Sequence, residues 1–211
     1  MDLAEIARGL WRWTAPHPEW TPGAEPGSTG DWERDVGSVF YEGPGAAVFI
    51  DPLLPPDEEK LFRTIDRRVR KLDRVVVLTT IRWHRRSRDA FVERYGATTS
   101  RARAQLPAGV EAFPVPGARE VVFWLPDLQA LVPGDTLIGH VGGRLRLCPE
   151  SWLHALPSEM TRPELAAALR PLLGRPVELV LTSHGPPVLT GGRRALARAL
   201  GQAQNSSATA K

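Results

Sequence analysis

The sequence predicts an α/β fold, an αββα sandwich in which two mixed β-sheets pack face to face between outer helices. Two observations lead to this prediction. Strand-like segments occur in runs, at residues 37–50 and 110–148, and amphipathic helical segments separate these runs. In addition, two apolar runs, 75–80 and 177–181, each follow a helical segment and end in a polar turn, as buried strands of α/β sheets do.

The first half of the chain combines turn-forming residues with apolar periodicity. Strands 37–42 and 46–50 flank a Gly-Pro-Gly turn, which predicts a hairpin. The helix predicted at 55–72 has acidic residues in its first turn and an apolar stripe at helical spacing. A second helix at 87–95 should end at Gly96. The other elements expected here are a strand at 6–13, a loop rich in Pro and Gly at 16–31, and a short strand at 98–102.

The second half repeats this organisation with a different sequence. Pro and Gly separate the strand-like segments, and leucines at helical spacing predict a helix before the last strand. The predicted elements are a strand at 110–115, paired strands at 120–125 and 128–133, paired strands at 137–139 and 144–148, helices at 163–173 and 191–204, and the strand at 177–181. We therefore expect one domain over 1–204 and a flexible polar tail at 205–211.

Composition is that of a soluble globular protein. The chain has 211 residues, of which 42% are hydrophobic, enough for a sizeable core. The net charge is +3 and the arginines are scattered, so nucleic-acid binding is not expected. The single cysteine, Cys148, excludes an intramolecular disulfide and a cysteine-based zinc cluster, and fits a reducing cytoplasm. No signal-peptide pattern and no apolar run of about 20 residues is present, so we expect a cytoplasmic protein without a membrane partner.

Three polar residues, His84, Asp135 and His184, follow strand-like segments directly. Ligands of α/β sheets bind at such ends, and two imidazoles with one carboxylate can hold a divalent ion such as zinc, manganese or iron. Each residue also has a simpler role. Asp135 can cap its own turn, His184 can hydrogen-bond a loop, and the arginines beside His84 would repel a cation. Because no two of them share a short metal-binding motif, spacing alone leaves the metal site open.

The turn that carries His84 is strongly cationic. It contains Arg82, Trp83 and Arg85, and we expect these residues, together with His17, to line a ligand pocket. A fixed guanidinium group binds carboxylate or phosphate well. The sequence therefore suggests a small anionic ligand.

Five short landmarks resemble the metallo-β-lactamase superfamily, the glyoxalase II-like hydrolases. In chain order they are Phe49-Ile50-Asp51-Pro52, Val77-Leu78-Thr79, Pro116-Gly117, residues 131–135, and Ser183-His184-Gly185. The resemblance implies the αββα sandwich and, where the family motif is intact, hydrolysis at a pair of zinc ions.

This chain departs from the family motif Thr-His-x-His-x-Asp-His at the central turn. A motif that starts at Thr79 has its four ligand positions at Thr80, Arg82, His84 and Arg85, and one that starts at Thr80 has them at Ile81, Trp83, Arg85 and Arg86. The histidine expected after Pro116-Gly117 is Ala118. The metal position built from three histidines is therefore missing in either register.

The preferred hypothesis is an αββα protein that has lost the dinuclear zinc site and binds a small anionic ligand. Arginine cannot ligate a metal, but it can supply the missing positive charge, so Arg85, or Arg82 in the shifted register, is predicted to pair with Asp135. No cofactor is then needed. The alternative is a hydrolase with one divalent metal on His84, Asp135 and His184.

Two further hypotheses need no metal. One is an acid–base enzyme in which Asp135 orients His84 or His184. The other is a structural or partner-binding role, because five of the seven tryptophans precede Trp124 and aromatic side chains often anchor interfaces. The sequence identifies neither a substrate nor an oligomeric state.

Overall fold

The first β-sheet contains the N-terminal half of the protein. The structure is a computed structural model that describes residues 3–100, 106–154 and 160–205. In spatial order the six strands are β1 (Ala4–Ala7), β2 (Leu10–Pro16), β3 (Asp35–Gly43), β4 (Ala46–Ile50), β5 (Arg74–Leu78) and β6 (Thr98–Ser100). Strands β1 to β4 are antiparallel neighbours, and β5 and β6 add in parallel. This sheet is therefore mixed, as predicted.

The second sheet contains strands from the C-terminal half. In spatial order they are β12 (Leu179–Val180), β9 (Ala130–Val132), β8 (Glu120–Leu125) and β7 (Glu111–Val115). β12 pairs with β9 in parallel, and the other pairs are antiparallel. A separate hairpin is formed by β10 (Leu137–His140) and β11 (Arg144–Leu147).

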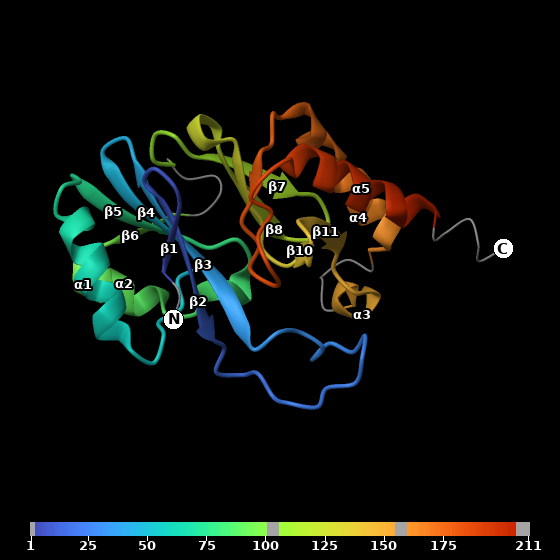
Figure 1. Ribbon diagram of the computed structural model, residues 1–211, viewed down its shortest axis with the longest axis horizontal. Helices are drawn as coiled ribbons and strands as arrows, with labels where there is room; N and C mark the ends of the chain where they lie inside the picture. The colour runs from blue at the N-terminus through green and yellow to red at the C-terminus, as the bar shows by residue number, and fades with distance from the viewer. Residues whose placement is uncertain (1–2, 101–105, 155–159, 206–211) are drawn as a thin grey trace.

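Helices lie on the outer faces of both sheets (Figure 1). The α-helices are α1 (Glu58–Val69), α2 (Arg88–Tyr95), α3 (Glu150–Leu153), α4 (Arg162–Leu169) and α5 (Gly192–Asn205). Short 3₁₀ helices are η1 (Arg82–Arg85), η2 (Pro126–Leu128) and η3 (Arg170–Gly174). The Asp57 side chain caps α1 by accepting from the backbone N–H of Lys60, which explains why this helix begins there.

The period-2 alternation of the strands separates an inner core from two outer cores. On β4, Val48 and Ile50 face the second sheet, where they pack in a cluster with Phe123 of β8. Phe49 faces the opposite way and packs with Phe62 of α1. The outer face of the second sheet packs in the same manner on α4 and α5. The predicted αββα sandwich is thus confirmed.

Several predicted boundaries are corrected by the structure. The strand predicted at 6–13 is two strands, because Gly9 turns the chain with a φ of 76°. The helix predicted at 163–173 changes to 3₁₀ geometry after Leu169, because Pro171 has no N–H to continue the α-helical bonding. The strand predicted at 177–181 is paired only at Leu179–Val180.

Other boundaries differ by a few residues. The helix predicted at 55–72 spans only Glu58–Val69, and α5 includes Asn205, the first residue of the predicted tail. Residues 206–211, and the end of the strand predicted at 98–102, lie outside the described residues. The single-domain assignment to 1–204 stays a prediction.

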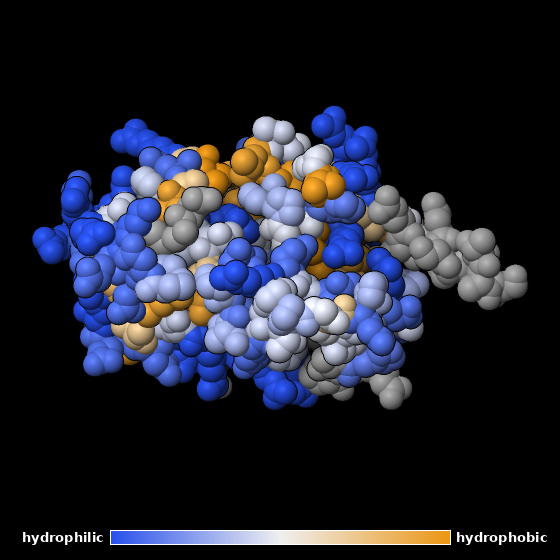
Figure 2. Space-filling model, turned by 60° about the horizontal axis from the view of Figure 1, so that its bottom comes forward, coloured by the Kyte–Doolittle hydropathy of each residue, from blue (hydrophilic) through white to orange (hydrophobic). Residues whose placement is uncertain are grey.

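Hydrophilic residues cover most of the face shown in Figure 2, with hydrophobic residues in smaller areas. The large hydrophobic side chains exposed in the described residues are Trp83, Val141 and Leu189. None of the described helices is long and apolar enough to cross a membrane.

Candidate active site

Three loops that leave strands of the two sheets bring His84, Asp135 and His184 together. His84 lies in η1 after β5, Asp135 lies between β9 and β10, and His184 lies after β12. Asp135 Oδ1 is 3.0 Å from Nε2 of His84 and 3.3 Å from Nε2 of His184. The convergence predicted from the strand ends is therefore correct. It agrees with the motif register that starts at Thr79, in which His84 occupies a ligand position.

Asp135 Oδ1 lies between the two histidine rings. It is buried, and both ring nitrogens are within ion-pair distance of it. One nitrogen from each histidine and one oxygen from Asp135 lie within 4.8 Å of one another. The three atoms converge on a common region, as the ligands of a metal ion do.

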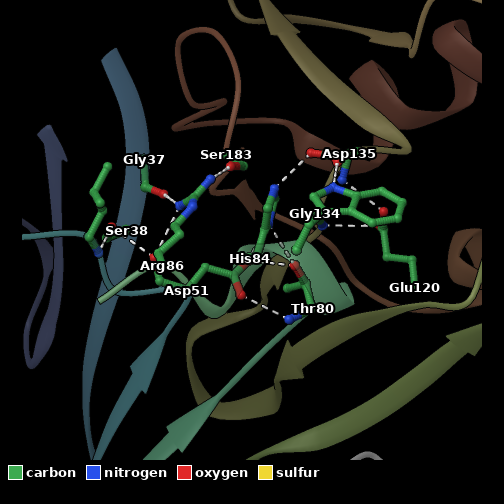
Figure 3. A network of polar contacts seen from close by, with 12 residues as sticks. Gly37, Ser38, Asp51, Thr80, His84, Arg86, Glu120, Gly134, Asp135 and Ser183 are labelled. Carbon is green, nitrogen blue, oxygen red and sulfur yellow. Dashed lines mark hydrogen bonds and ion pairs between the residues drawn. The ribbon is translucent and has the colours of Figure 1, made fainter. Parts of the chain in front are cut away.

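Asp51 holds the opposite side of the His84 ring. Its Oδ2 is 2.9 Å from Nδ1 of His84, and its carboxylate also accepts from the backbone N–H and the hydroxyl of Thr80. Asp51 is buried and has a φ of 48°, in the left-handed region that aspartate adopts more readily than most residues other than glycine. Figure 3 shows His84 between Asp51 and Asp135. A carboxylate on the far nitrogen is the usual support of a metal-binding histidine, because it fixes the ring and its tautomer.

The arginine that enters the site is Arg86, which corrects the prediction for Arg82 and Arg85. Those two side chains are exposed and do not line the cavity. Arg86 instead donates to the carbonyls of Gly37 and Asp51 and to Oγ of Ser183, at 2.8, 3.0 and 2.5 Å (Figure 3).

The predicted ion pair of Arg85 or Arg82 with Asp135 is therefore wrong. Asp135 contacts the two histidines and Trp83 instead. Arg86 has a φ of 43°, which is uncommon for arginine.

The charges of the site are coupled. Burial and the nearby Arg86 guanidinium lower the pKa of His84, but the carboxylates of Asp135 and Asp51 outweigh them and raise it to about 9. Burial raises the pKa of Asp135, but the charges and contacts of His84 and His184 hold it well below its usual range. Without a metal, His84 is therefore an imidazolium between two carboxylates.

Two residues fix Asp135 from other sides. The indole N–H of Trp83 donates to its Oδ2 at 2.6 Å, and Glu120 accepts from its backbone N–H at 2.7 Å. Glu120 also accepts from the backbone of Gly134 and from the backbone and hydroxyl of Thr136. The Asp135 turn is thus wrapped around one buried carboxylate. A Cβ at Gly134 would lie 2.7–2.9 Å from the side-chain oxygens of Thr80 and Glu120, so only glycine fits there.

Glu120 is a site residue that sequence reasoning missed. It is buried, lines the cavity, and has its pKa raised to about 7, chiefly by burial, although the donors from Thr136 and Gly134 oppose that shift. The available signal was its place, two residues after Ala118, at the start of the apolar strand β8. A carboxylate at the start of a buried strand needs several donors, and these come from a turn 14–16 residues further along the chain.

His184 is positioned by backbone contacts. Its carbonyl accepts from the N–H of Gly139 at 2.9 Å, and a Cβ added to Gly139 would lie 1.9 Å from the carbonyl oxygen of Pro186. The buried Arg12 guanidinium donates to the carbonyls of Thr182 and Gly185 on either side of the histidine. The loop after β12 therefore has little freedom to move.

A cavity of about 220 Å³ opens over this cluster. Three tryptophans from distant parts of the chain contribute to its walls, and the Trp32 and Trp152 rings meet the His184 ring edge-on, with centroids 5.4 and 5.1 Å away. The lining residues are His17, Glu19, Thr29, Trp32, Trp83, His84, Glu120, Asp135, Thr136, Cys148, Trp152 and His184. His17 and Trp83 thus lie where they were predicted, whereas the described lining contains no lysine or arginine.

The position that three histidines would occupy has no equivalent donors. Ala118 is fully buried and offers none, and Arg82 is exposed. Within the described residues, the His84, Asp135 and His184 group is the one cluster of three histidines, cysteines or acidic residues close enough to share an ion.

Solved structures with a similar backbone fold identify the fold of this chain. A metallo-β-lactamase from Erythrobacter litoralis, described as NDM/FIM-1-like and in its mono-zinc form, has a TM-score of 0.63 at 14% identity, with 97% of this chain and 96% of that chain covered. A metallo-β-lactamase from Pontibacter korlensis has a TM-score of 0.57 at 17% identity, with 97% and 99% covered. The chain has the metallo-β-lactamase fold.

A metallo-β-lactamase family protein from Thermus thermophilus shares this fold with a TM-score of 0.53 at 16% identity, with 95% of this chain and 81% of that chain covered. No protein-family model and no curated protein sequence matches the chain. The resemblance predicted from five landmarks is confirmed for the metallo-β-lactamase fold. At this level of identity the fold gives no substrate.

Proposed function

We propose that this metallo-β-lactamase-fold protein has lost the first metal position and is a hydrolase that holds one divalent ion on His84, Asp135 and His184. The observation that carries the proposal is the convergence of one ligand atom from each residue to within 4.8 Å of the others. Ligands of a tetrahedral zinc ion, each about 2.0–2.1 Å from the metal, are about 3.3 Å apart. The contacts of 3.0 and 3.3 Å at Asp135 Oδ1 are close to that spacing.

The donor set also fits an ion that takes part in chemistry. Two histidines and one carboxylate are three protein ligands, which leaves a coordination position for water or substrate. All three residues line the cavity, so a substrate has access to them. One of the similar solved structures is described as a mono-zinc form, which supports single occupancy in this fold.

The residues around the cluster have roles that follow from their contacts. When bound, such an ion activates water and polarises a substrate carbonyl. Asp51 keeps Nε2 of His84 directed at Asp135 by holding Nδ1. Glu120 lines the same cavity and holds the turn of Asp135 through hydrogen bonds that it accepts from Gly134, Asp135 and Thr136. Trp32, Trp83 and Trp152 supply aromatic surface to the walls of the cavity.

The test is a metal titration of the purified protein, first stripped with a chelator. We expect one zinc, manganese or iron ion per chain by elemental analysis, and its loss in the His84→Ala and His184→Ala variants. His140→Ala, a change at an exposed histidine outside the cavity, is the matched control and should keep the ion. Two tightly bound ions per chain, or equal binding by wild type and His184→Ala, would contradict the proposal.

A second candidate is a metal-free protein that binds a small anionic ligand. One observation favours it. Protonated His84 and Arg86 together balance the charges of Asp51 and Asp135, so these four residues carry no net charge without a metal. The same titration decides between the two. If no divalent ion binds to the stripped protein at neutral pH, and small carboxylates or phosphate do, the second function is the correct one.

A further inference from the structure

A second cavity, of about 140 Å³, lies between the β10–β11 hairpin and the first half of α5. It shares no lining residue with the cavity of the candidate active site. Four arginines line it, Arg144, Arg146, Arg194 and Arg198, and we call them the arginine groove. No aspartate or glutamate is among the described lining residues.

The four arginines come from two elements that border the hollow. On β11, Leu145 and Leu147 are buried in the cluster that contains Leu196 and Leu200 of α5, so Arg144 and Arg146 project from the other face of the strand. On α5, Arg194 and Arg198 are four residues apart and share one exposed face of the helix. Both pairs border the same hollow.

The four positive charges are not neutralised within the described residues. None of them forms an ion pair with an acidic side chain there, and the recorded side-chain bond of Arg144 is to the carbonyl of Val141. The nearby Glu178 carboxylate accepts instead from the backbone N–H of Gly191. Like charges four residues apart on a helix repel, so an anion in the groove would relieve an unfavourable interaction.

The ligand would be held by guanidinium groups and not by the helix end. The backbone N–H groups of Gly191, Gly192 and Arg193 already donate to Glu178 and Val177. An arginine guanidinium presents paired donors that match two phosphate oxygens, and it stays charged at all physiological pH values. A carboxylate has two oxygens and matches the paired donors of one guanidinium group, whereas a phosphate group can accept from several arginines at once.

We propose that the arginine groove binds a phosphate group. The proposal is independent of the function of the candidate active site. Two sources of the phosphate are compatible with the surroundings. A free phosphate or diphosphate fits the hollow itself. A phospholipid headgroup fits as well, because Val141 and Leu189, 62% and 48% exposed, are sequence neighbours of the lining residues His140 and Thr190.

The experiment compares two double variants of equal charge. Arg194→Gln with Arg198→Gln removes half of the groove, and Arg63→Gln with Arg67→Gln makes the same change at the same spacing on the exposed face of α1. The probes are inorganic phosphate and pyrophosphate, measured by calorimetry, and phosphatidylcholine vesicles with and without phosphatidylglycerol, measured by sedimentation. We expect the groove variant to bind at least about tenfold more weakly than wild type, and the α1 variant to bind as wild type does.

The outcomes separate the two sources. Binding of phosphate or pyrophosphate that needs Arg194 and Arg198 assigns a soluble ligand. Binding only to vesicles that contain phosphatidylglycerol, with the same arginine dependence, assigns a headgroup. Absence of binding to both probes, or equal loss in the groove and α1 variants, overturns the proposal. If the α5 double variant does not fold, Arg144→Gln with Arg146→Gln on β11 replaces it, with the same expected result.

Discussion

Both ring nitrogens of His84 contact carboxylates, Nδ1 that of Asp51 and Nε2 that of Asp135. Two buried negative charges on one ring keep its proton bound far above the usual pKa of histidine, which is 6.5. A divalent ion on Nε2 would have to displace that proton. Metal binding and pH are therefore linked through this one residue.

The pH dependence of stability should show this directly in the metal-free protein. The folded pKa of His84, about 9, is above its unfolded value of 6.5, so its stabilisation is fully present below about pH 6.5 and is lost as pH rises through about 9. The difference corresponds to roughly 3 kcal/mol. Urea unfolding in the presence of a chelator should therefore give a falling free energy of unfolding across this window.

His84→Gln is the control for that measurement, and its stability should be flat over the same window. Glu120 acts mainly at lower pH, because its pKa is raised from 4.5 to about 7, so stability that depends on its proton is lost between those values. A wild-type curve without slope above about pH 6.5 would show that His84 is not held as an imidazolium.

Glu120 is expected to be the main structural support of the Asp135 turn. Glu120→Gln replaces an acceptor oxygen with an NH₂ group that faces backbone donors, which leaves buried N–H groups without partners. We expect a loss of about 2–4 kcal/mol in the free energy of unfolding. Glu111→Gln, on the neighbouring strand β7, breaks only an exposed ion pair with Arg175 and should change stability by less than about 1 kcal/mol. Equal effects of the two changes would rule out this role.

At the scale of elements, the turn after β5 shows what sequence could and could not predict. A buried strand followed by a polar turn is visible in the residue pattern, and so the position of His84 was predictable. Three arginines of identical chemistry follow the strand, at 82, 85 and 86. Which of them points inward depends on the positive φ of Arg86, and arginine has no preference for positive φ that would reveal it in the sequence.

The role of Glu120 could not be predicted for a different reason. Its place at the start of an apolar strand indicates burial, but its hydrogen-bond partners belong to a turn beyond the next strand. By contrast, the helices and most strands follow from periodicity that is local to each element. The fold could therefore be predicted from the sequence more completely than the residues that hold the candidate site in place.

Arg86 joins three elements, and its removal should be severe. Its guanidinium bonds β3, the turn after β4 and the loop after β12 through Gly37, Asp51 and Ser183. We expect Arg86→Ala to lower the free energy of unfolding by about 3–5 kcal/mol, because it leaves buried acceptors and a carboxylate without their counter-charge. Arg85→Ala, one residue earlier but exposed, should change it by less than about 0.5 kcal/mol. Denaturant unfolding of the two variants distinguishes the arginines, and similar losses would refute the assignment.

At the scale of the whole molecule, the candidate ligands come from both halves of the sandwich. His84 follows a strand of the first sheet, whereas Asp135 and His184 follow strands of the second. An ion bound to all three would connect the two sheets. Binding of metal should therefore stabilise the entire fold and not only the loops that hold it.

Zinc is expected to raise the midpoint of thermal unfolding in a concentration-dependent manner. A ligand that binds only the folded protein adds about 2.7 kcal/mol at a free concentration of about 100 times its Kd. A chelator should reverse the shift, and His184→Ala should abolish it, whereas His140→Ala should retain it. A midpoint that zinc does not change would argue against a metal that bridges the sheets.

The backbone contact between Gly139 and the loop of His184 has a consequence for redesign of this protein. Any side chain at Gly139 would run into Pro186, and one at Gly185 would come within 2.2 Å of the carbonyl oxygen of Gly139. Almost all substitutions at these two positions would therefore misplace His184, so mutagenesis of the cavity should leave both glycines unchanged. Trp32 and Trp152 pack edge-on against the ring of the same histidine, so substitutions in this part of the cavity wall should disturb the backbone of the His184 loop less.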